Sequence, residues 1–228
     1  MPAFISHITY LNKFWVEMGY PESFRNDGIL GSMLPDVRYI TKQDRKLTHL
    51  KESFKDAKTY GQLFDNILGD TENKISSPDG SSEKIHHFRM GFAFHIALDQ
   101  WWPKQIYFPS EFEKIGACLK LLDDILLASE VDKINMEDEL ALPYKIKFLD
   151  LSDALIEKWY NFVFGYIKKR PTLQNIKEML VEGELFDEKT SEEISREVNK
   201  IFNESDVRNK LQDMYESFSW KEISKNQI

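Results

Sequence analysis

The chain has 228 residues, of which 42% are hydrophobic and 30% are charged, and its net charge is -8 at pH 7. A chain of this length and composition can bury a core of its own, so we exclude a disordered or collagen-like protein. The excess of acidic residues argues against a dedicated nucleic-acid-binding protein, because such proteins need basic surfaces to contact the phosphate backbone. It does not exclude an enzyme that cuts a phosphodiester.

Cysteine content and hydropathy exclude further classes. The single cysteine, Cys118, excludes an internal disulfide framework and a cysteine-rich zinc module. Charged residues interrupt the apolar runs well before the roughly 18 residues that a transmembrane helix needs. The first residues lack the basic and apolar regions of a secretory signal. We therefore expect a soluble, cytoplasmic protein without a transmembrane segment.

Apolar residues recur every three or four positions along most of the chain, which is the period of an α-helix. Strict alternation of apolar and polar residues, which is typical of a strand, is rare. We predict an all-α fold, a single domain of roughly seven to nine helices with few or no strands. The pattern is clearest in segments 3–18, 85–102, 112–127, 149–167, 173–181, 191–202 and 207–218.

Two breaks divide this pattern. Residues 69–84 are polar and contain Gly and Pro, which predicts a surface loop. Composition becomes more acidic and less aromatic after Arg170-Pro171. We expect residues 1–170 to form a helical core and residues 171–228 to form a C-terminal helical layer on the same domain. The last five residues, 224–228, are expected to fray.

The segment 85–102 carries the first candidate functional residues. It is nearly all apolar between Phe88 and Leu98, so the helix it predicts belongs in the interior. His95 and Asp99 are four residues apart and therefore lie on one face of this helix, with Gly91 one turn before them. Burying an imidazole and a carboxylate is costly unless each finds a partner. Either these two side chains pair with each other, or both bind a cation.

Three more candidates precede this helix. His7 lies on the apolar face of the first predicted helix. Asp36 follows an apolar stretch and a proline, at a position where a helix should end. His49 follows Thr48 at the start of a polar segment. Taken singly, these residues also fit a core histidine, a turn aspartate and a surface histidine. Together, three imidazoles and two carboxylates suit a borderline metal such as Zn²⁺.

The order of these motifs resembles that of the zinc-dependent phospholipase C family, whose all-helical fold is shared with single-strand-specific fungal nucleases. The matching features are His7, the GSMLPD stretch at 31–36, Thr48-His49 and the GFAFHIALD helix at 91–99. Members of that family have an N-terminal His, Gly-x-x-x-Pro-Asp, Thr-His and Gly-Tyr-x-x-His-x-x-x-Asp in this order. The resemblance covers roughly residues 1–105.

This resemblance implies a set of metal ligands. His49, His95 and Asp99 would hold one zinc ion, and Asp99 would bridge to a second ion bound by His7. Asp36 would be the acid-base group or a further ligand. The metal would lower the pKa of a bound water and polarise the phosphoryl oxygen.

The chain also departs from the family. A third zinc ion there uses two more histidines and a glutamate downstream, whereas this chain has no histidine after His95. Family members are secreted and use a processed N-terminal amine as a ligand, and this chain lacks a secretory signal. We therefore expect one or two ions, Zn²⁺ or another divalent metal, and a substrate other than intact phospholipid.

The resulting hypothesis is a metal-dependent hydrolase of a small-molecule or headgroup-type phosphoester, with Asp36 as proton acceptor. The alternative is a catalytically inactive helical binding or interaction protein on the same fold, in which His95 and Asp99 only hydrogen-bond. A third option is a different metal-dependent reaction, because a fold does not fix a function. Whether the chain forms a homo-oligomer is left open.

Other polar residues are given structural roles or weaker functional ones. We expect His86 and His87 at a helix start or on the surface, and Cys118 in the core. Arg38 and Arg89 are candidate phosphate clamps, although a solvated arginine is the more common explanation. Trp101 and Trp102 fit core aromatics better than walls of a site. Two acidic runs, Asp123-Asp124 and residues 137–139, are expected on a solvated face.

Overall fold

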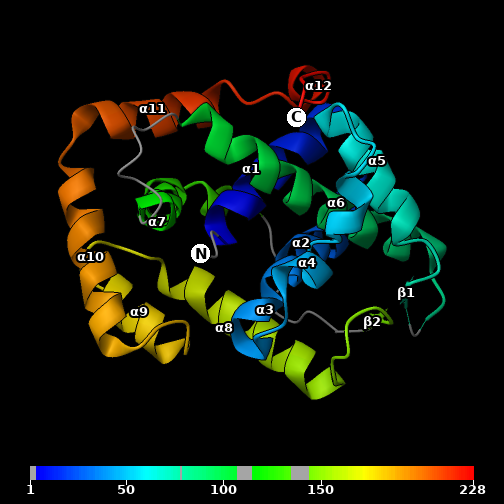
Figure 1. The fold of residues 1–228 in the computed structure, drawn as a ribbon, viewed down its shortest axis with the longest axis horizontal. Helices are drawn as coiled ribbons and strands as arrows, with labels where there is room; N and C mark the ends of the chain where they lie inside the picture. Colours follow the sequence, from blue (N-terminus) through cyan, green and yellow to red (C-terminus); the bar gives the residue numbers. More distant parts are fainter. Residues whose placement is uncertain (1–3, 78, 107–114, 135–143) are drawn as a thin grey trace.

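The computed structural model describes residues 4–77, 79–106, 115–134 and 144–228, and within these ranges the chain is predominantly helical (Figure 1). This confirms the all-α prediction. The principal helices are α1 (Phe4–Met18), α2 (Arg25–Met33), α5 (Tyr60–Asp70), α6 (Ser82–Gln105), α7 (Ile115–Leu127), α8 (Asp153–Lys169), α9 (Ile176–Glu182), α10 (Glu188–Phe202) and α11 (Ser205–Glu216).

Several short elements join them. Each of the helices α3 (Arg38–Thr41), α4 (Arg45–Thr48) and α12 (Trp220–Ile223) has four residues. Short 3₁₀ helices cover Glu22–Phe24, Leu34–Val37, Lys51–Phe54 and Val131–Lys133. These single turns raise the number of helices above the predicted seven to nine, because they are too short to show a repeating apolar pattern. No helix in the described ranges is long and apolar enough to cross a membrane.

Helix α6 is the centre of the molecule. Every side chain from Met90 to Asp99 is buried, as expected for a helix that is apolar on all sides. Its first turn is capped by Ser81, whose hydroxyl accepts a hydrogen bond from the Lys84 amide. Helices α1, α2 and α5 pack against it. The candidate residues His95 and Asp99 are therefore held by a buried helix with neighbours on several sides.

Helices α2 and α6 approach so closely that only glycine fits between them. A Cβ atom added to Gly91 would lie 1.8 Å from the carbonyl oxygen of Gly28, and one added to Gly31 would lie 1.8 Å from that of Phe88. Since real Cβ atoms do not approach carbonyl oxygens to this distance, these glycines set the separation of the two backbones. In the structure the backbone of α2 occupies the space beside Gly91.

Aromatic side chains fix α1 between α6 and α8. Phe14 of α1 stacks on Phe94 of α6 with ring centroids 4.8 Å apart, and Phe4 packs edge-on against Trp159 of α8 at 5.4 Å. The Trp159 indole donates a hydrogen bond to the carbonyl of Met33, at the end of α2. These contacts bury the face of α1 that carries His7.

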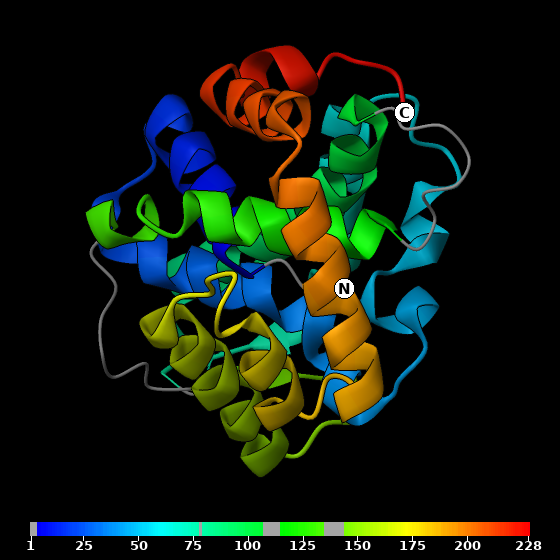
Figure 2. The ribbon, with the colours of Figure 1, turned by 90° about the vertical axis from the view of Figure 1, so that its left-hand side faces the viewer.

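Helices α9, α10 and α11 form an outer layer along one side of the molecule, as the two perpendicular views show (Figures 1 and 2). Helix α10 packs against α7 and α9, and α11 also packs against α7. Helix α10 begins at Glu188 and is capped by Asp187, which accepts a hydrogen bond from Thr190. The helix therefore begins before the predicted segment 191–202, and Ser191 is buried within it.

The predicted loop 69–84 is partly ordered by a small sheet. Strand β1 (Ile75–Ser76) pairs antiparallel with β2 (Lys145–Ile146), with Ile75 opposite Ile146. Ile75, the one apolar residue of this polar segment, is buried in the core. The prediction of few or no strands is therefore accurate, and the flanking helices α5 and α6 extend into the segment that was expected to be a loop.

The last residues are paired with another segment, which contradicts the expectation that they fray. Thr59 and Gln227 form a β-bridge, and the Ile228 amide donates a hydrogen bond to the carbonyl of Lys58. The amide of Gly61 in turn donates to the carbonyl of Ser224. Fraying was expected because terminal residues are often poorly ordered, whereas backbone hydrogen bonds hold these residues.

The close approach of α2 and α6 gives a stability prediction. Replacing Gly91 by Ala forces the two backbones apart, and we expect Gly91→Ala to lower the free energy of unfolding by about 3 kcal/mol or more. The matched control is Gly165→Ala in α8, where an added Cβ would meet no atom within 4 Å. It should keep or raise stability by up to about 1 kcal/mol, because alanine favours a helix. Urea denaturation followed by circular dichroism measures both, and equal stability of the two variants would contradict this packing.

Candidate metal centre

The five candidate residues come together beneath the surface from four parts of the chain. His7 belongs to α1, Asp36 to the 3₁₀ helix Leu34–Val37, His49 directly follows α4, and His95 and Asp99 belong to α6. Each is at most 7% exposed. Ligand atoms lie within 4.8 Å of one another in two groups: His7, His95 and Asp99, and Asp36, His49 and His95. Donors at 2.0–2.1 Å from one ion are about 3.3–4.2 Å apart, so the spread is close to that of a metal site.

His95 belongs to both groups, and its environment fixes which nitrogen carries the proton. Its Nδ1 lies 2.6 Å from the carbonyl oxygen of Ser32 on α2. A carbonyl oxygen only accepts hydrogen bonds, so Nδ1 must donate, and the neutral ring then has its lone pair on Nε2. That Nε2 is buried without a hydrogen-bond partner. A metal-binding histidine is typically oriented in this way by a carbonyl on its other nitrogen.

His49 is oriented in the same manner. Its Nδ1 lies 2.9 Å from the hydroxyl of Thr48, and that hydroxyl also faces the carbonyl oxygen of Arg45 at 3.5 Å. The arrangement that satisfies both contacts has the hydroxyl donating to the carbonyl and Nδ1 donating to the hydroxyl. Nε2 of His49 is then an acceptor, and it is buried without a hydrogen-bond partner. The Thr-His pair thus has a physical role.

Asp99 lies at the centre of the cluster. Its Oδ2 is 3.4 Å from Nε2 of His49 and 4.0 Å from Nε2 of His95, and its Oδ1 is 3.6 Å from Nε2 of His7. The rings of His7 and His95 stack with centroids 3.9 Å apart. With the tautomers assigned above, Nε2 of His49 and Nε2 of His95 are both hydrogen-bond acceptors, and both face Oδ2 of Asp99, which is also an acceptor. A cation placed among them would satisfy all three atoms.

Two basic residues that the sequence analysis did not single out also contact Asp99. Lys120 of α7 donates to Oδ1 at 2.5 Å, and Arg45 of α4 donates to Oδ2. Lys120 is mostly buried, whereas 39% of the Arg45 side chain is exposed. Their signal in the sequence is weak, because a single basic residue on an amphipathic helix usually faces solvent. Arg38, which was singled out, lies with Nε 3.8 Å from Oδ1 of Asp36.

Electrostatics keep the cluster in a metal-ready protonation state. Burial alone would raise the pKa of Asp99, but Lys120 and the surrounding histidines hold this pKa well below its usual range. Burial lowers the pKa of His95 well below its ordinary value, and the neighbouring His7 contributes. Burial also lowers the pKa of His49, against the opposing effect of Asp99. Near neutral pH, Asp99 is ionised and both histidines are neutral, which is the state that binds a metal.

Other residues considered in the sequence analysis do not join this cluster. His87 is buried rather than at the surface, since its ring stacks on Phe24 at 4.5 Å and its Nδ1 lies 2.8 Å from the carbonyl of Glu83. His86 is exposed, as expected. Arg89 donates to the hydroxyl of Thr71 and to the carbonyl of Leu68, so it holds the end of α5.

Cys118 is buried, as predicted for a core residue. Trp101 packs in the core against Tyr10 and Phe218. Residues 137–139 lie outside the described ranges.

Asp123 and Asp124 are fully buried, which corrects their prediction as a solvated face. Asp124 accepts hydrogen bonds from the amide and hydroxyl of Ser6 and from the hydroxyl of Tyr166. Asp123 accepts one from the Trp102 indole. Burial raises the pKa of Asp123 to about 7 and that of Asp124 to about 6. Adjacent charges in a helix are usually solvated, whereas here side chains of α1, α6 and α8 enclose the two carboxylates.

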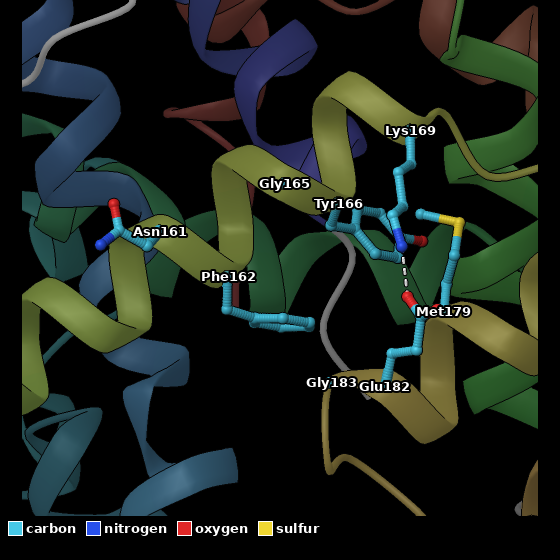
Figure 3. Close-up of a pocket in the computed structure, with 8 residues that line it drawn as sticks. All are labelled: Asn161, Phe162, Gly165, Tyr166, Lys169, Met179, Glu182 and Gly183. Atoms are coloured by element: carbon cyan, nitrogen blue, oxygen red, sulfur yellow. Dashed lines mark hydrogen bonds and ion pairs between the residues drawn. The ribbon is translucent and has the colours of Figure 1, made fainter.

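A pocket of about 150 Å³ lies between α8 and α9, away from the cluster (Figure 3). Phe162 and Met179 line it, and an ion pair between Lys169 and Glu182 joins its two sides. None of the five candidate ligands lines this pocket.

Comparisons of this chain with protein-family models, with curated proteins and with solved structures found no match. Any function proposed for this chain therefore rests on the geometry of the described residues. The resemblance to the zinc-dependent phospholipases C stays a prediction from motifs.

The buried acid Asp123 gives a pH prediction. Its pKa is raised from 3.8 to about 7, so the folded state holds a proton that the unfolded state releases. The stability contributed by this proton is complete below pH 4 and is lost as the pH rises to about 7. Asp123→Asn cannot ionise, so its free energy of unfolding relative to the wild type should rise over this interval, by on the order of 2–4 kcal/mol.

Urea denaturation of both proteins at several pH values between about 4 and 8 measures this difference. Comparing the two proteins removes the contribution of the histidines, whose lowered pKa values favour the folded state at higher pH. A difference that does not change with pH would show that Asp123 is ionised in the folded protein.

Proposed function

We propose that this chain is a metal-dependent hydrolase that binds a divalent ion, Zn²⁺ in the first instance, and cleaves a phosphoester. One observation carries the proposal: Nε2 of His49 and Nε2 of His95 are buried without a hydrogen-bond partner and lie 3.4 and 4.0 Å from Oδ2 of Asp99. Arg45 and Lys120 donate to Asp99, whereas in the described parts of the chain neither histidine nitrogen has a hydrogen-bond partner. Because His95 has one free nitrogen and belongs to both ligand groups, we propose a single ion bound through it.

A divalent ion in such a site supplies an activated water and polarises the bond to be hydrolysed. Asp36 is the residue of the cluster that can accept the proton of the attacking water. It is 5% exposed and lies with His49 and His95 in one of the two ligand groups. As the proton acceptor, Asp36 needs a carboxylate oxygen that does not bind the ion. As a ligand, Asp36 binds the ion through that oxygen. The experiments below separate these two roles.

The basic residues at the cluster favour an anionic substrate. Arg38, Arg45 and Lys120 supply three positive charges around the two carboxylates Asp36 and Asp99. Nε of Arg38 and Nε of Arg45 have no hydrogen-bond partner, and Arg45 is the most exposed of the three. A guanidinium group binds a phosphate with two parallel hydrogen bonds. We therefore propose a small-molecule or headgroup-type phosphoester that enters on the side of Arg45.

The second candidate is a helical binding protein without catalytic activity, and the contacts of Asp99 favour it. Lys120 and Arg45 already neutralise this carboxylate, and they would oppose the approach of a metal cation. In that protein the cluster serves stability alone. Metal binding decides between the two candidates.

The first prediction from this proposal concerns metal content. After removal of bound metal and reconstitution with zinc chloride, the wild-type chain should hold about one equivalent of Zn²⁺. His95→Ala and Asp99→Asn should each hold less than about half an equivalent, because each removes a ligand. Elemental analysis measures the metal, and a higher melting temperature of the zinc-loaded wild type reports binding independently.

The control is His86→Ala, which removes an exposed histidine of the same helix and should leave the metal content unchanged. Full metal content in His95→Ala and Asp99→Asn would overturn the ligand assignment. A wild-type chain that takes up no metal would favour the inactive binding protein.

The second prediction concerns catalysis. The zinc-loaded chain should hydrolyse a chromogenic phosphoester, either bis(p-nitrophenyl) phosphate or p-nitrophenyl phosphate, faster than p-nitrophenyl acetate. If Asp36 is the proton acceptor, Asp36→Asn should keep its zinc and lose about 10²- to 10⁴-fold in kcat. Loss of zinc from this variant would make Asp36 a ligand instead. Hydrolysis of the acetate alone would refute a phosphoester substrate.

A further inference from the structure

A second polar site lies between α7 and α11. It is a pocket of about 300 Å³ lined by residues from the end of α7, the turn after it and α11. This volume is at the lower end of the range for small-molecule sites. Leu126, Leu127 and Leu211 provide apolar walls, and Asp123 lines it as the most deeply buried charged residue. None of the five candidate metal ligands takes part in it.

The carboxylate of Asp123 has an incomplete set of hydrogen bonds. Its Oδ2 accepts from the indole of Trp102 at 3.0 Å, while its Oδ1 is buried without a partner. The carboxylate of the adjacent Asp124, by comparison, accepts three hydrogen bonds, two from Ser6 and one from Tyr166. A buried carboxylate oxygen without a donor costs free energy, so the site lacks one donor.

Three lysines around the pocket are engaged elsewhere. Lys120, one turn before Asp123 on α7, donates to Asp99. Lys13 of α1 donates to the backbone carbonyls of Tyr215 and Glu216 at the end of α11. Lys133 pairs with Glu130, another residue that lines the pocket. These three lysines thus have other partners, and within the described residues none of them donates a hydrogen bond to Asp123.

A second buried polar atom lies nearby. The hydroxyl of Tyr10 is fully buried and has no hydrogen-bond partner. The Tyr10 ring packs edge-on against Tyr215, which lines the pocket, at 5.3 Å. Burial raises the pKa of Tyr10, and the nearby charge of Asp123 raises it further. A ligand with several donor hydrogens could serve Asp123 and the tyrosine hydroxyl together.

We propose that this pocket binds a small organic ammonium ion, whose nitrogen donates to Oδ1 of Asp123 and whose apolar part lies against the leucines. An ammonium group carries the charge and the donors that Asp123 lacks. A metal ion is the poorer choice, because in the described parts of the chain the groups of three or more ligands close enough to hold one are both at His95. The proposal is independent of the metal centre and of its activity.

The test is calorimetric titration of the full chain with benzylammonium chloride near pH 8, with benzyl alcohol as the neutral ligand of the same shape. Benzylammonium should bind saturably, with one ligand per chain. Benzyl alcohol should bind at least about tenfold more weakly, since it cannot form the charged hydrogen bond. The same loss is expected for benzylammonium with Asp123→Asn, which keeps the shape and the bond from Trp102.

Asp213→Asn is the matched control, because it removes an exposed carboxylate of α11 that does not line the pocket, and it should bind as the wild type does. Leu126→Trp keeps Asp123 but fills the pocket, and it should abolish binding of both ligands. Circular dichroism confirms that each variant is folded. Absence of saturable binding to the wild type, or equal binding by the wild type and either pocket variant, would overturn the proposal.

Discussion

The contact between α2 and α6 is the constraint on which the candidate metal centre depends. Glycines on both helices bring the two backbones together, and Ser32, next to Gly31, then presents its carbonyl oxygen to Nδ1 of His95. That hydrogen bond fixes the tautomer of His95 and turns its lone pair toward Asp99. A wider separation of the helices would leave the ring free to rotate. The close packing of the two backbones therefore determines how His95 is oriented in the candidate site.

The charges around Asp99 set a balance between two uses of the cluster. A buried carboxylate needs compensation, and Lys120 and Arg45 supply it in the metal-free protein. The same two side chains are suited to hold an anionic substrate if a metal takes over the carboxylate. Arg45 can move most easily, because its side chain is partly exposed, whereas Lys120 is mostly enclosed. Whether the cluster can bind a metal ion depends on how readily Arg45 and Lys120 release the carboxylate of Asp99.

Much of the fold and the candidate ligands could be predicted from sequence, for definite physical reasons. The pair His95 and Asp99 stands out because two polar groups four residues apart interrupt a run that is otherwise apolar. Their partners Lys120 and Arg45 give no such signal, since their positions depend on how α4 and α7 pack on α6. Burial of His87 and Asp123 was missed for the same reason. Local periodicity locates elements, while tertiary packing decides which polar groups they enclose.

The helices α6 and α7 connect the two polar sites described above. On α6, Asp99 of the candidate metal centre and Trp102, which donates to Asp123, are one turn apart. On α7, Lys120 and Asp123 are spaced in the same way. A shift of either helix would therefore change the positions of side chains in both sites. Thermodynamic reciprocity then requires that if occupancy of one site alters the affinity of the other, the effect is equal in both directions. The architecture thus offers a short route for allosteric communication.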